Sequence, residues 1–212
     1  MPEAAAEQPA PEVVDLKEPA LAALLGWLIP GLGHWYQGRR AKAVLFFVCI
    51  MGTFAYGVCL SSSNAPVDNK KDTTIGWGRT VYFSWRENDR RLPYLCQIGI
   101  GLPALPALIQ ANRMANNQKV WWHGFMAPPW PSKEAREAAR SAGHDQNYSQ
   151  PTLHDLHRQL HRYFELGTVF TMVGGLLNVL AMYDAWGGPV APPPKKEDED
   201  DSDDETKDEA QP

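Results

Sequence analysis

Four long stretches without any Asp, Glu, Lys or Arg constrain the fold of this chain more than any other feature. They cover residues 19–38, 43–67, 92–112 and 166–183. The hydrocarbon layer of a bilayer is about 30 Å thick, and about 20 apolar helical residues cross it because each adds about 1.5 Å of rise. All four stretches reach or approach that length. The sequence therefore predicts an all-α integral membrane protein with three to four transmembrane helices.

The two ends of the chain are polar and low in large apolar side chains. Residues 1–18 are rich in Ala, Glu and Pro, whereas residues 189–212 run from a proline cluster into an acidic sequence. Such segments bury too little surface to offset the entropy lost on ordering. We predict a disordered N-terminal tail at 1–18, a helical membrane domain at 19–188 and a disordered acidic tail at 189–212. The acidic tail also argues against a nucleic-acid partner.

Prolines distinguish the four stretches from one another. The second stretch has none between residues 43 and 60, so it is the clearest transmembrane prediction. The first contains Pro30, and the third contains Pro93, Pro103 and Pro106. Proline lacks a backbone donor, so these helices must be kinked or broken unless neighbouring groups satisfy the freed carbonyls. The first stretch can therefore either cross the bilayer or dip into it and return.

Small residues line one face of the fourth helical segment, 166–186. At 100° per residue, six of them fall within about 40° of one line along the helix. In lipid, helices associate through close backbone approach and interhelical hydrogen bonds, so this seam is predicted to meet another helix of the chain or of a second copy. The six residues of the seam are Gly167, Thr171, Gly174, Asn178, Ala181 and Ala185.

The polar connections at 68–91 and 113–165 differ in character, and the second one ends in an amphipathic pattern. Apolar residues recur there at helical spacing, which predicts a helix that lies along the lipid headgroups. They are Leu153, Leu156, Leu160 and Phe164.

Three histidines stand beside this apolar stripe. They are His154, His157 and His161. One interpretation is a zinc or copper site, because imidazoles one helical turn apart can share an ion. A straight helix aims only two of them at one ion, so such a site needs further ligands, for example His34 or Asp155. The other interpretation is that they form polar contacts with headgroups.

Asp184 is an ionisable residue near the C-terminal end of the fourth segment. The helix dipole is unfavourable for a negative charge at this end, so we expect a cationic or hydrogen-bonding partner. Ionisable groups inside membrane helices also mark transport pathways. Asp184 and Asn178 could therefore serve a proton or ion pathway instead.

The chain lacks the sequence motifs of common enzymes. It has no Walker loop, nucleophile elbow, HExxH motif or paired catalytic carboxylates, so neither an enzyme nor a cofactor is predicted. The GWGRT sequence at 76–80 has two glycines and an arginine, which is too little to indicate a phosphate site. Cys49, Cys59 and Cys96 show no zinc-binding spacing and are expected to act as small apolar residues.

A turn rich in glycine and aromatic residues follows the first apolar run. Its residues include Pro30, Gly31, Gly33, His34, Tyr36 and Gly38, and the sequence continues as RRAKAVLFF. This turn resembles that of the two-transmembrane-segment domain family, whose second helix also carries an aspartate, as GGLLNVLAMYDA does here. Over residues 19–190 the chain resembles an uncharacterised bacterial family of small membrane proteins. The shared features are PGLGHWYQGRRAKAVLFFVCI, GLPALPALIQ and LHRQLHRYFELGTVFTMVGGLLNVLAMYDAWGGP. The resemblance implies a multi-pass protein of the bacterial inner membrane and supplies no activity.

Three functions are compatible with these patterns. The leading hypothesis is a membrane scaffold or assembly subunit that contacts the lipid bilayer and either a second copy or another membrane protein. The first alternative is a small transport or ion-permeation unit that uses Asp184 and Asn178. The second is the interfacial metal site at the three histidines. For orientation, the cations Arg39, Arg40 and Lys42 favour the cytoplasmic side, because they lie close to helix ends.

Overall fold

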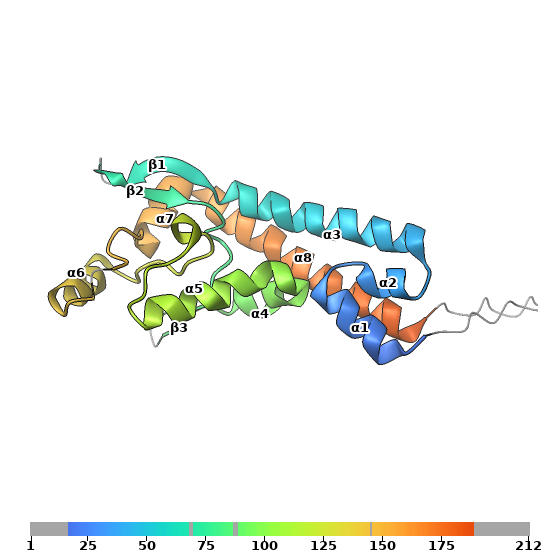
Figure 1. Cartoon of the computed structure of the whole chain (residues 1–212). Helices are drawn as coiled ribbons and strands as arrows, with labels where there is room; N and C mark the ends of the chain where they lie inside the picture. The colour runs from blue at the N-terminus through green and yellow to red at the C-terminus, as the bar shows by residue number, and fades with distance from the viewer. Residues whose placement is uncertain (1–16, 68–69, 87–88, 145, 189–212) are drawn as a thin grey trace, which may run out of the picture.

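Two long antiparallel helices lie side by side in the molecule (Figure 1). The computed structural model describes residues 17–67, 70–86, 89–144 and 146–188, so almost all of both predicted tails lies outside it. The long helices are α3 (Arg40–Leu60) and α8 (Arg162–Gly187), which pack together along their length. Near one end the Lys42 ammonium of α3 pairs with Asp184 of α8, and near the other end Gly57 lies against Gly167.

The first and third uncharged stretches are divided into short helices. The first forms α1 (Pro19–Leu28) and α2 (Leu32–Tyr36). The third forms α4 (Pro93–Gln97), the 3-10 turns η1 (Ile98–Ile100) and η2 (Leu102–Ala104), and α5 (Leu105–Ala115). Within the described part of the chain, two helices, α3 and α8, are long and apolar enough to cross a membrane. The structure therefore does not support the predicted three to four spans, and the breaks fall next to prolines.

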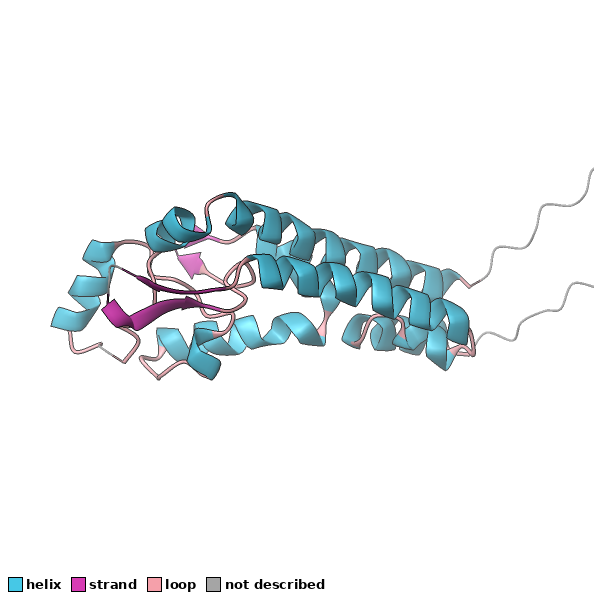
Figure 2. Ribbon diagram, turned by 90° about the horizontal axis from the view of Figure 1, so that it is seen from above, coloured by secondary structure: helices cyan, strands magenta, loops and turns pink. Residues whose placement is uncertain are grey.

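Each divided stretch folds back on itself as a hairpin (Figures 1 and 2). The first hairpin, residues 19–36, lies at the end of the molecule where α3 begins. The second hairpin, residues 93–115, starts from the opposite end. Both pack on α8, and the Trp27 indole N–H of the first donates to the Ile98 carbonyl of the second over 3.2 Å. The tips of the two hairpins therefore meet partway along α8.

The described residues of 61–92 and 116–161, here called the head region, extend beyond one end of the long helices (Figure 2). They include the antiparallel pairs β1 (Ser63–Val67) with β2 (Lys70–Gly76) and β3 (Trp85–Arg86) with β4 (Asp89–Arg90). Helical elements follow the second hairpin: η3 (Trp122–Gly124), α6 (Lys133–Ser141) and α7 (Leu153–Leu160). The fold is thus mostly helical, as predicted, with two short strand pairs that the all-α prediction missed.

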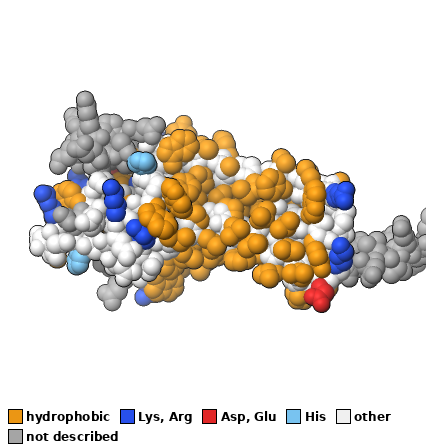
Figure 3. Space-filling model, in the orientation of Figure 1, with side chains coloured by type: hydrophobic (Ala, Val, Ile, Leu, Met, Phe, Trp, Pro, Cys, Tyr) orange, Lys and Arg blue, Asp and Glu red, His pale blue; other side chains and the backbone are white. Residues whose placement is uncertain are grey.

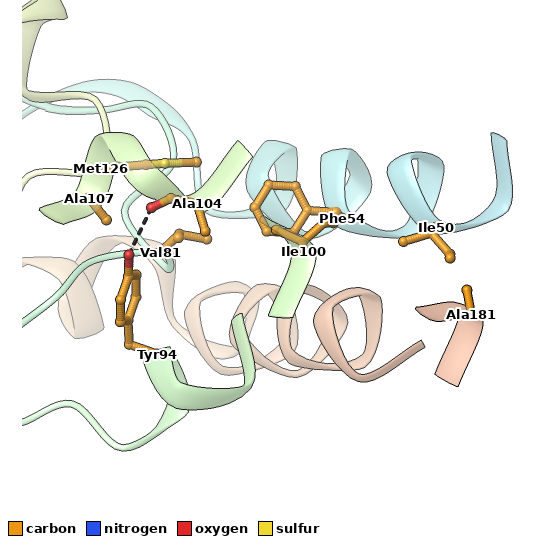
Figure 4. Close-up of a cluster of buried hydrophobic side chains, with 9 residues drawn as sticks. All are labelled: Ile50, Phe54, Val81, Tyr94, Ile100, Ala104, Ala107, Met126 and Ala181. Atoms are coloured by element: carbon orange, nitrogen blue, oxygen red, sulfur yellow. Dashed lines mark hydrogen bonds between the residues drawn. The ribbon is translucent and has the colours of Figure 1, made fainter. Parts of the chain in front are cut away.

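One apolar core connects the long helices to the head region (Figure 4). Its buried side chains come from α3, α8, the second hairpin and the loops around residues 81 and 126. The Tyr94 hydroxyl, inside this core, donates to the Ala104 carbonyl over 2.9 Å. The buried members are Ile50, Phe54, Val81, Tyr94, Ile100, Ala104, Ala107, Met126 and Ala181.

The amphipathic helix predicted along the headgroups packs on protein instead. Leu156 and Leu160 of α7, together with Phe164, are buried against Ile75 and Tyr82 of the head region. The helix begins with a capping box between Thr152 and Asp155 and ends before His161, whose φ of 47° turns the chain into α8. The apolar stripe was correctly recognised, but its partner is the β2 segment and the residues after it rather than lipid.

Candidate functional site

Asn178 is a fully buried amide near the middle of α8 that joins three segments of the chain. Its Nδ2 donates to the Gly26 carbonyl of α1 over 3.1 Å and to the Gly99 carbonyl of η1 over 2.9 Å. Gly26 and Gly99 lie close to the tips of the two hairpins. A single side chain therefore fixes both tips to the long helix.

Prolines explain why these two carbonyls need a donor from outside their own segments. In a continuous helix, residue i+4 donates its amide to the carbonyl of residue i. That position is Pro30 for Gly26 and Pro103 for Gly99. Proline has no N–H to donate. The Asn178 amide thus replaces the two hydrogen bonds that the prolines remove.

The remaining contacts at the tips are close. Gly101 has a φ of 81°, and a Cβ added to it would overlap the Trp27 carbonyl oxygen. Glycine is required there because it alone adopts this conformation without steric cost and leaves room for the neighbouring backbone. The tips are therefore held both by hydrogen bonds and by direct backbone packing.

The small-residue seam of α8 faces other segments of the same chain. All six residues of the seam are buried. A Cβ on Gly167 would lie 2.7 Å from the Gly57 carbonyl oxygen of α3, and one on Gly174 would lie 3.2 Å from Phe54 Cβ. The Thr171 hydroxyl accepts a hydrogen bond from Gln97 Nε2 over 2.8 Å. This face is thus fully used inside one copy of the chain.

Asp184 is the centre of a charged cluster at the far end of α8. Its Oδ2 lies 2.6 Å from His34 Nε2, 2.6 Å from Lys42 Nζ and 3.6 Å from an Arg39 terminal nitrogen. His34 is buried, whereas Asp184 and Lys42 are about one-third exposed. The Gln37 amide donates to the neighbouring Ala185 carbonyl. Asp184 thus has cationic and hydrogen-bonding partners at the position where the helix dipole disfavours its charge.

The glycine-and-aromatic turn contributes one side chain to this cluster, His34. The other residues of the turn determine how the backbone around His34 packs on its neighbours. Gly31 has a φ of 82° and packs on the Ala43 carbonyl, and Gly33 packs on the Ala22 carbonyl. Tyr36 has the Lys17 ammonium 5.1 Å from its ring centre, and Gly38 is open to solvent. The turn therefore packs the first hairpin closely against α3 and places the His34 imidazole beside Asp184.

Replacing Asp184 with Asn tests the strength of this cluster. Asp184→Asn removes the charge that three neighbouring basic groups share, so we expect a modest loss of stability, about 1 kcal/mol, because the carboxylate is partly exposed to solvent. The melting temperature of the purified protein in detergent should fall by a few degrees. Arg162→Gln, an exposed cation at the other end of α8, serves as the control for a change of one charge. Equal melting temperatures for Asp184→Asn and wild type would contradict a stabilising role.

The three histidines of the predicted metal site do not converge. His157 contacts the Leu153 carbonyl at 3.0 Å and the Glu165 carboxylate at 3.3 Å. His161 lies beyond the end of α7 and contacts the Gln159 carbonyl. His34 lies at Asp184, and the Asp155 carboxylate caps α7. No group of three or more His, Cys, Asp or Glu among the described residues is placed to hold a metal ion.

Comparison with known families supports the expectation of an uncharacterised family. A model of a family of unknown function, DUF6677, matches residues 21–198. The chain belongs to this family. Comparisons with curated proteins and with solved structures found no match. Membership in DUF6677 thus confirms that the family is uncharacterised, and the site must be interpreted from its own geometry.

Proposed function

We propose that this DUF6677 chain is an integral membrane protein that crosses the bilayer twice, through α3 and α8, and acts as a membrane scaffold. The observation that carries this proposal is the exposure of large apolar side chains along both helices. Val48 of α3 is 61% exposed and Leu180 of α8 is 65% exposed. In the core of a water-soluble protein such helices would be mostly buried. In α3 and α8, only 28% and 39% of the most apolar 18-residue stretch is buried. Lipid is the solvent that favours this arrangement.

The dimensions and edges of the apolar surface agree with a bilayer. The 21 residues of α3 correspond to about 31 Å of helix, close to the hydrocarbon thickness. Figure 3 shows hydrophobic side chains in a broad band, with Lys and Arg beyond it at both ends. Exposed aromatic residues occur near both ends of α8, Tyr163 at its start and Tyr183 and Trp186 at its end. Aromatic and cationic side chains are enriched at membrane interfaces.

The broken hairpins are compatible with this environment because their backbone is satisfied internally. Irregular backbone occurs at membrane depth only where protein groups or water supply the missing hydrogen bonds. Asn178 supplies them for Gly26 and Gly99. In this proposal each hairpin enters from one side, ends near the centre of the bilayer and returns to the side from which it came.

The scaffold role rests on the continuity between the long helices and the head region. Gln97 bonds both Thr171 of α8 and the Thr80 carbonyl of the head, over 2.8 and 3.1 Å. Arg91 donates to Thr168 of α8 over 3.0 Å. The core in Figure 4 also joins the two parts. The membrane helices would therefore hold the head region in a fixed position at one bilayer surface.

The contacts favour this role over the permeation hypothesis. Asp184 lies near the end of its helix and is paired with His34, Lys42 and Arg39. Asn178 lies about 9 Å away along the helix, at 1.5 Å per residue, and uses its amide on the two hairpin tips. Both groups thus stabilise the packing of the chain against itself.

Labelling of single cysteines tests the two-span topology. In a variant without Cys49, Cys59 and Cys96, one cysteine is introduced at Glu18, Gly38, Ser141 or Gly187, and sealed vesicles of uniform orientation are treated with a membrane-impermeant maleimide. Glu18, Gly38 and Gly187 should react from the same side, because the first hairpin returns to its side of entry. Ser141, in the head region, should react from the opposite side.

The position of Gly38 distinguishes the alternatives. If the first stretch crossed the bilayer, Glu18→Cys and Gly38→Cys would react from opposite sides. If the protein does not span, all four cysteines would react from the outside in intact vesicles, and alkaline carbonate would release the chain from the membrane. Either result would overturn the proposed topology.

A further inference from the structure

The head region contains a cavity of about 530 Å³ whose lining is rich in cationic side chains. Arg79, Arg113, Lys119 and His123 contribute to the lining, together with Trp121 and Gln150. Cavities of this size are typical of small-molecule sites. Since no acidic residue is present among the described residues that line it, the cavity is suited to an anion.

Arg79 is a buried cation whose hydrogen-bond partners among the described residues are neutral. It is 1% exposed, and its guanidinium donates to the Ile75 carbonyl, to the Ala127 carbonyl over 3.3 Å and to Gln150 Oε1 over 2.9 Å. In the described ranges, no carboxylate lies within ion-pair distance of it. A guanidinium has five N–H donors, and described residues accept from three of those on Arg79, which leaves one on each terminal nitrogen. Burial lowers the pKa of Arg79 to about 9, which leaves the group charged at neutral pH.

Two glycines, Gly76 and Gly124, keep side-chain carbons away from the Arg79 guanidinium. A Cβ on Gly124, whose φ is 82°, would lie 2.8 Å from an Arg79 terminal nitrogen, and one on Gly76 would lie 3.1 Å from the same nitrogen. Trp122 and His123 also have positive φ values, 47° and 55°. Non-glycine residues rarely adopt this conformation, and such residues cluster at ligand-binding sites.

Two buried amides hold the strained wall of the cavity in place. Gln110 accepts a hydrogen bond from the Trp121 amide over 3.0 Å and donates to the Trp121 and Phe125 carbonyls. Asn147 accepts from the Val120 amide over 3.0 Å and donates to the Gln118 carbonyl. These hydrogen bonds hold the wall in one conformation, which lowers the cost of binding a ligand.

Arg113 and Lys119 also line the cavity. Arg113 stacks over Trp121, with its guanidinium carbon 4.3 Å from the ring centre, and donates through Nε to the Lys119 carbonyl. This hydrogen bond uses one of its five N–H donors, and within the described part of the chain the terminal nitrogens are left for a ligand. Trp121 and Trp122 are 46% and 57% exposed. The site thus combines a buried guanidinium, a guanidinium stacked on an indole ring and an ammonium group.

We propose that this cavity binds a phosphate-class oxyanion through Arg79, Arg113 and Lys119. Guanidinium forks match the geometry of phosphate oxygens, and the negative charge would compensate the buried cation. The volume leaves room for the organic part of a phosphate monoester or diester. The anion can be a soluble phosphate ester or the headgroup of an anionic phospholipid. Binding of soluble phosphate would hold whether or not the proposed membrane topology is right.

Titration of the full-length protein in detergent with inorganic phosphate tests the site. Calorimetry at pH 7 should show saturable binding with one site per chain. Arg113→Gln together with Lys119→Gln should weaken it at least tenfold, and this pair leaves the buried Arg79 intact if Arg79→Gln fails to fold. Arg162→Gln, an exposed cation outside the cavity, should bind as wild type does. Absence of binding, or equal loss in Arg162→Gln, counts against a soluble phosphate ligand.

A lipid arm of the experiment distinguishes the source of the anion. The protein is placed in nanodiscs of phosphatidylcholine alone or with phosphatidylglycerol, and retained lipid is measured by native mass spectrometry. A headgroup ligand predicts retention of phosphatidylglycerol by wild type and Arg162→Gln, with loss in the Arg113→Gln, Lys119→Gln pair. If neither phosphate nor phosphatidylglycerol binds in a way that depends on this pair, the proposal is wrong.

Discussion

Asn178→Leu should destabilise this protein by about 2 to 4 kcal/mol, the largest effect expected of any single polar residue. The substitution conserves approximate size but removes the donor for the Gly26 and Gly99 carbonyls. Prolines occupy the two positions from which a helix would otherwise supply a donor, so neither carbonyl has a local alternative. A buried unsatisfied carbonyl costs about 1 to 3 kcal/mol.

The measurement is unfolding of the purified protein in mixed micelles by increasing fractions of a denaturing detergent. The control is Leu180→Ala, which truncates a side chain that is 65% exposed on the same helix. That variant should unfold at nearly the wild-type midpoint. An Asn178→Leu midpoint equal to the control would show that other groups satisfy the two carbonyls.

The two long helices were predictable because their signal is local. Residues 43–60 form an uninterrupted apolar run, and α3 covers Arg40–Leu60. The segment predicted at 166–186 lies within α8, Arg162–Gly187. Continuous apolar sequence without proline determines a long helix by itself. The additional residues at their N-terminal ends, 40–42 and 162–165, include charged side chains and extend the helices beyond the uncharged run.

The partners of the broken stretches could not be predicted in the same way. Pro30 and Pro103 indicate that carbonyls are freed, but the donor lies 152 residues from Gly26 and 79 residues from Gly99. The same limit applied to Asp184, whose nearest imidazole is 150 residues away. The sequence therefore indicates that these carbonyls and the Asp184 carboxylate need partners. Tertiary packing determines which residues those partners are.

An amphipathic pattern also does not identify what covers its apolar face. The stripe at Leu156, Leu160 and Phe164 fits lipid and protein equally well by period, and here it packs on Ile75 and Tyr82.

The cationic cavity could not be predicted from the sequence for a related reason. Arg79 within GWGRT has the sequence context of an exposed loop, and its burial depends on Ala127 and Gln150, which are distant in sequence. Neighbouring glycines at 76 and 78 were the only local signal.

Gly174 and Gly175 show that the predicted small-residue seam omits a residue of α8 that packs closely on another helix. Gly174 lies on the predicted line and faces Phe54 of α3. Gly175, one residue and about 100° further round the helix, faces α4 instead, where an added Cβ would overlap the Cys96 carbonyl oxygen. The predicted line includes Gly174, which faces α3, and Thr171, which bonds Gln97 of α4. The close packing on α4 also uses Gly175, which the prediction did not include.

Gly175→Ala should therefore be among the most damaging single-methyl substitutions in this chain, with a loss of about 3 kcal/mol in unfolding free energy. The methyl group meets backbone atoms of α4 rather than the flexible end of a side chain, so only a shift of the whole second hairpin can relieve the overlap. That shift would also lengthen the hydrogen bond from Asn178 to the Gly99 carbonyl, and the two effects should add.

Gly52→Ala is the matched control, because Gly52 lies in the other long helix and a Cβ there would meet nothing within 4 Å. It should be neutral or slightly stabilising, since alanine is the better helix former. Gly174→Ala should fall between the two, because its Cβ would lie 3.2 Å from Phe54 Cβ. Unfolding midpoints in the order Gly52→Ala, Gly174→Ala, Gly175→Ala would support packing of α8 against both α3 and α4. A Gly175→Ala midpoint equal to that of Gly52→Ala would mean that α4 does not pack on α8 at this position.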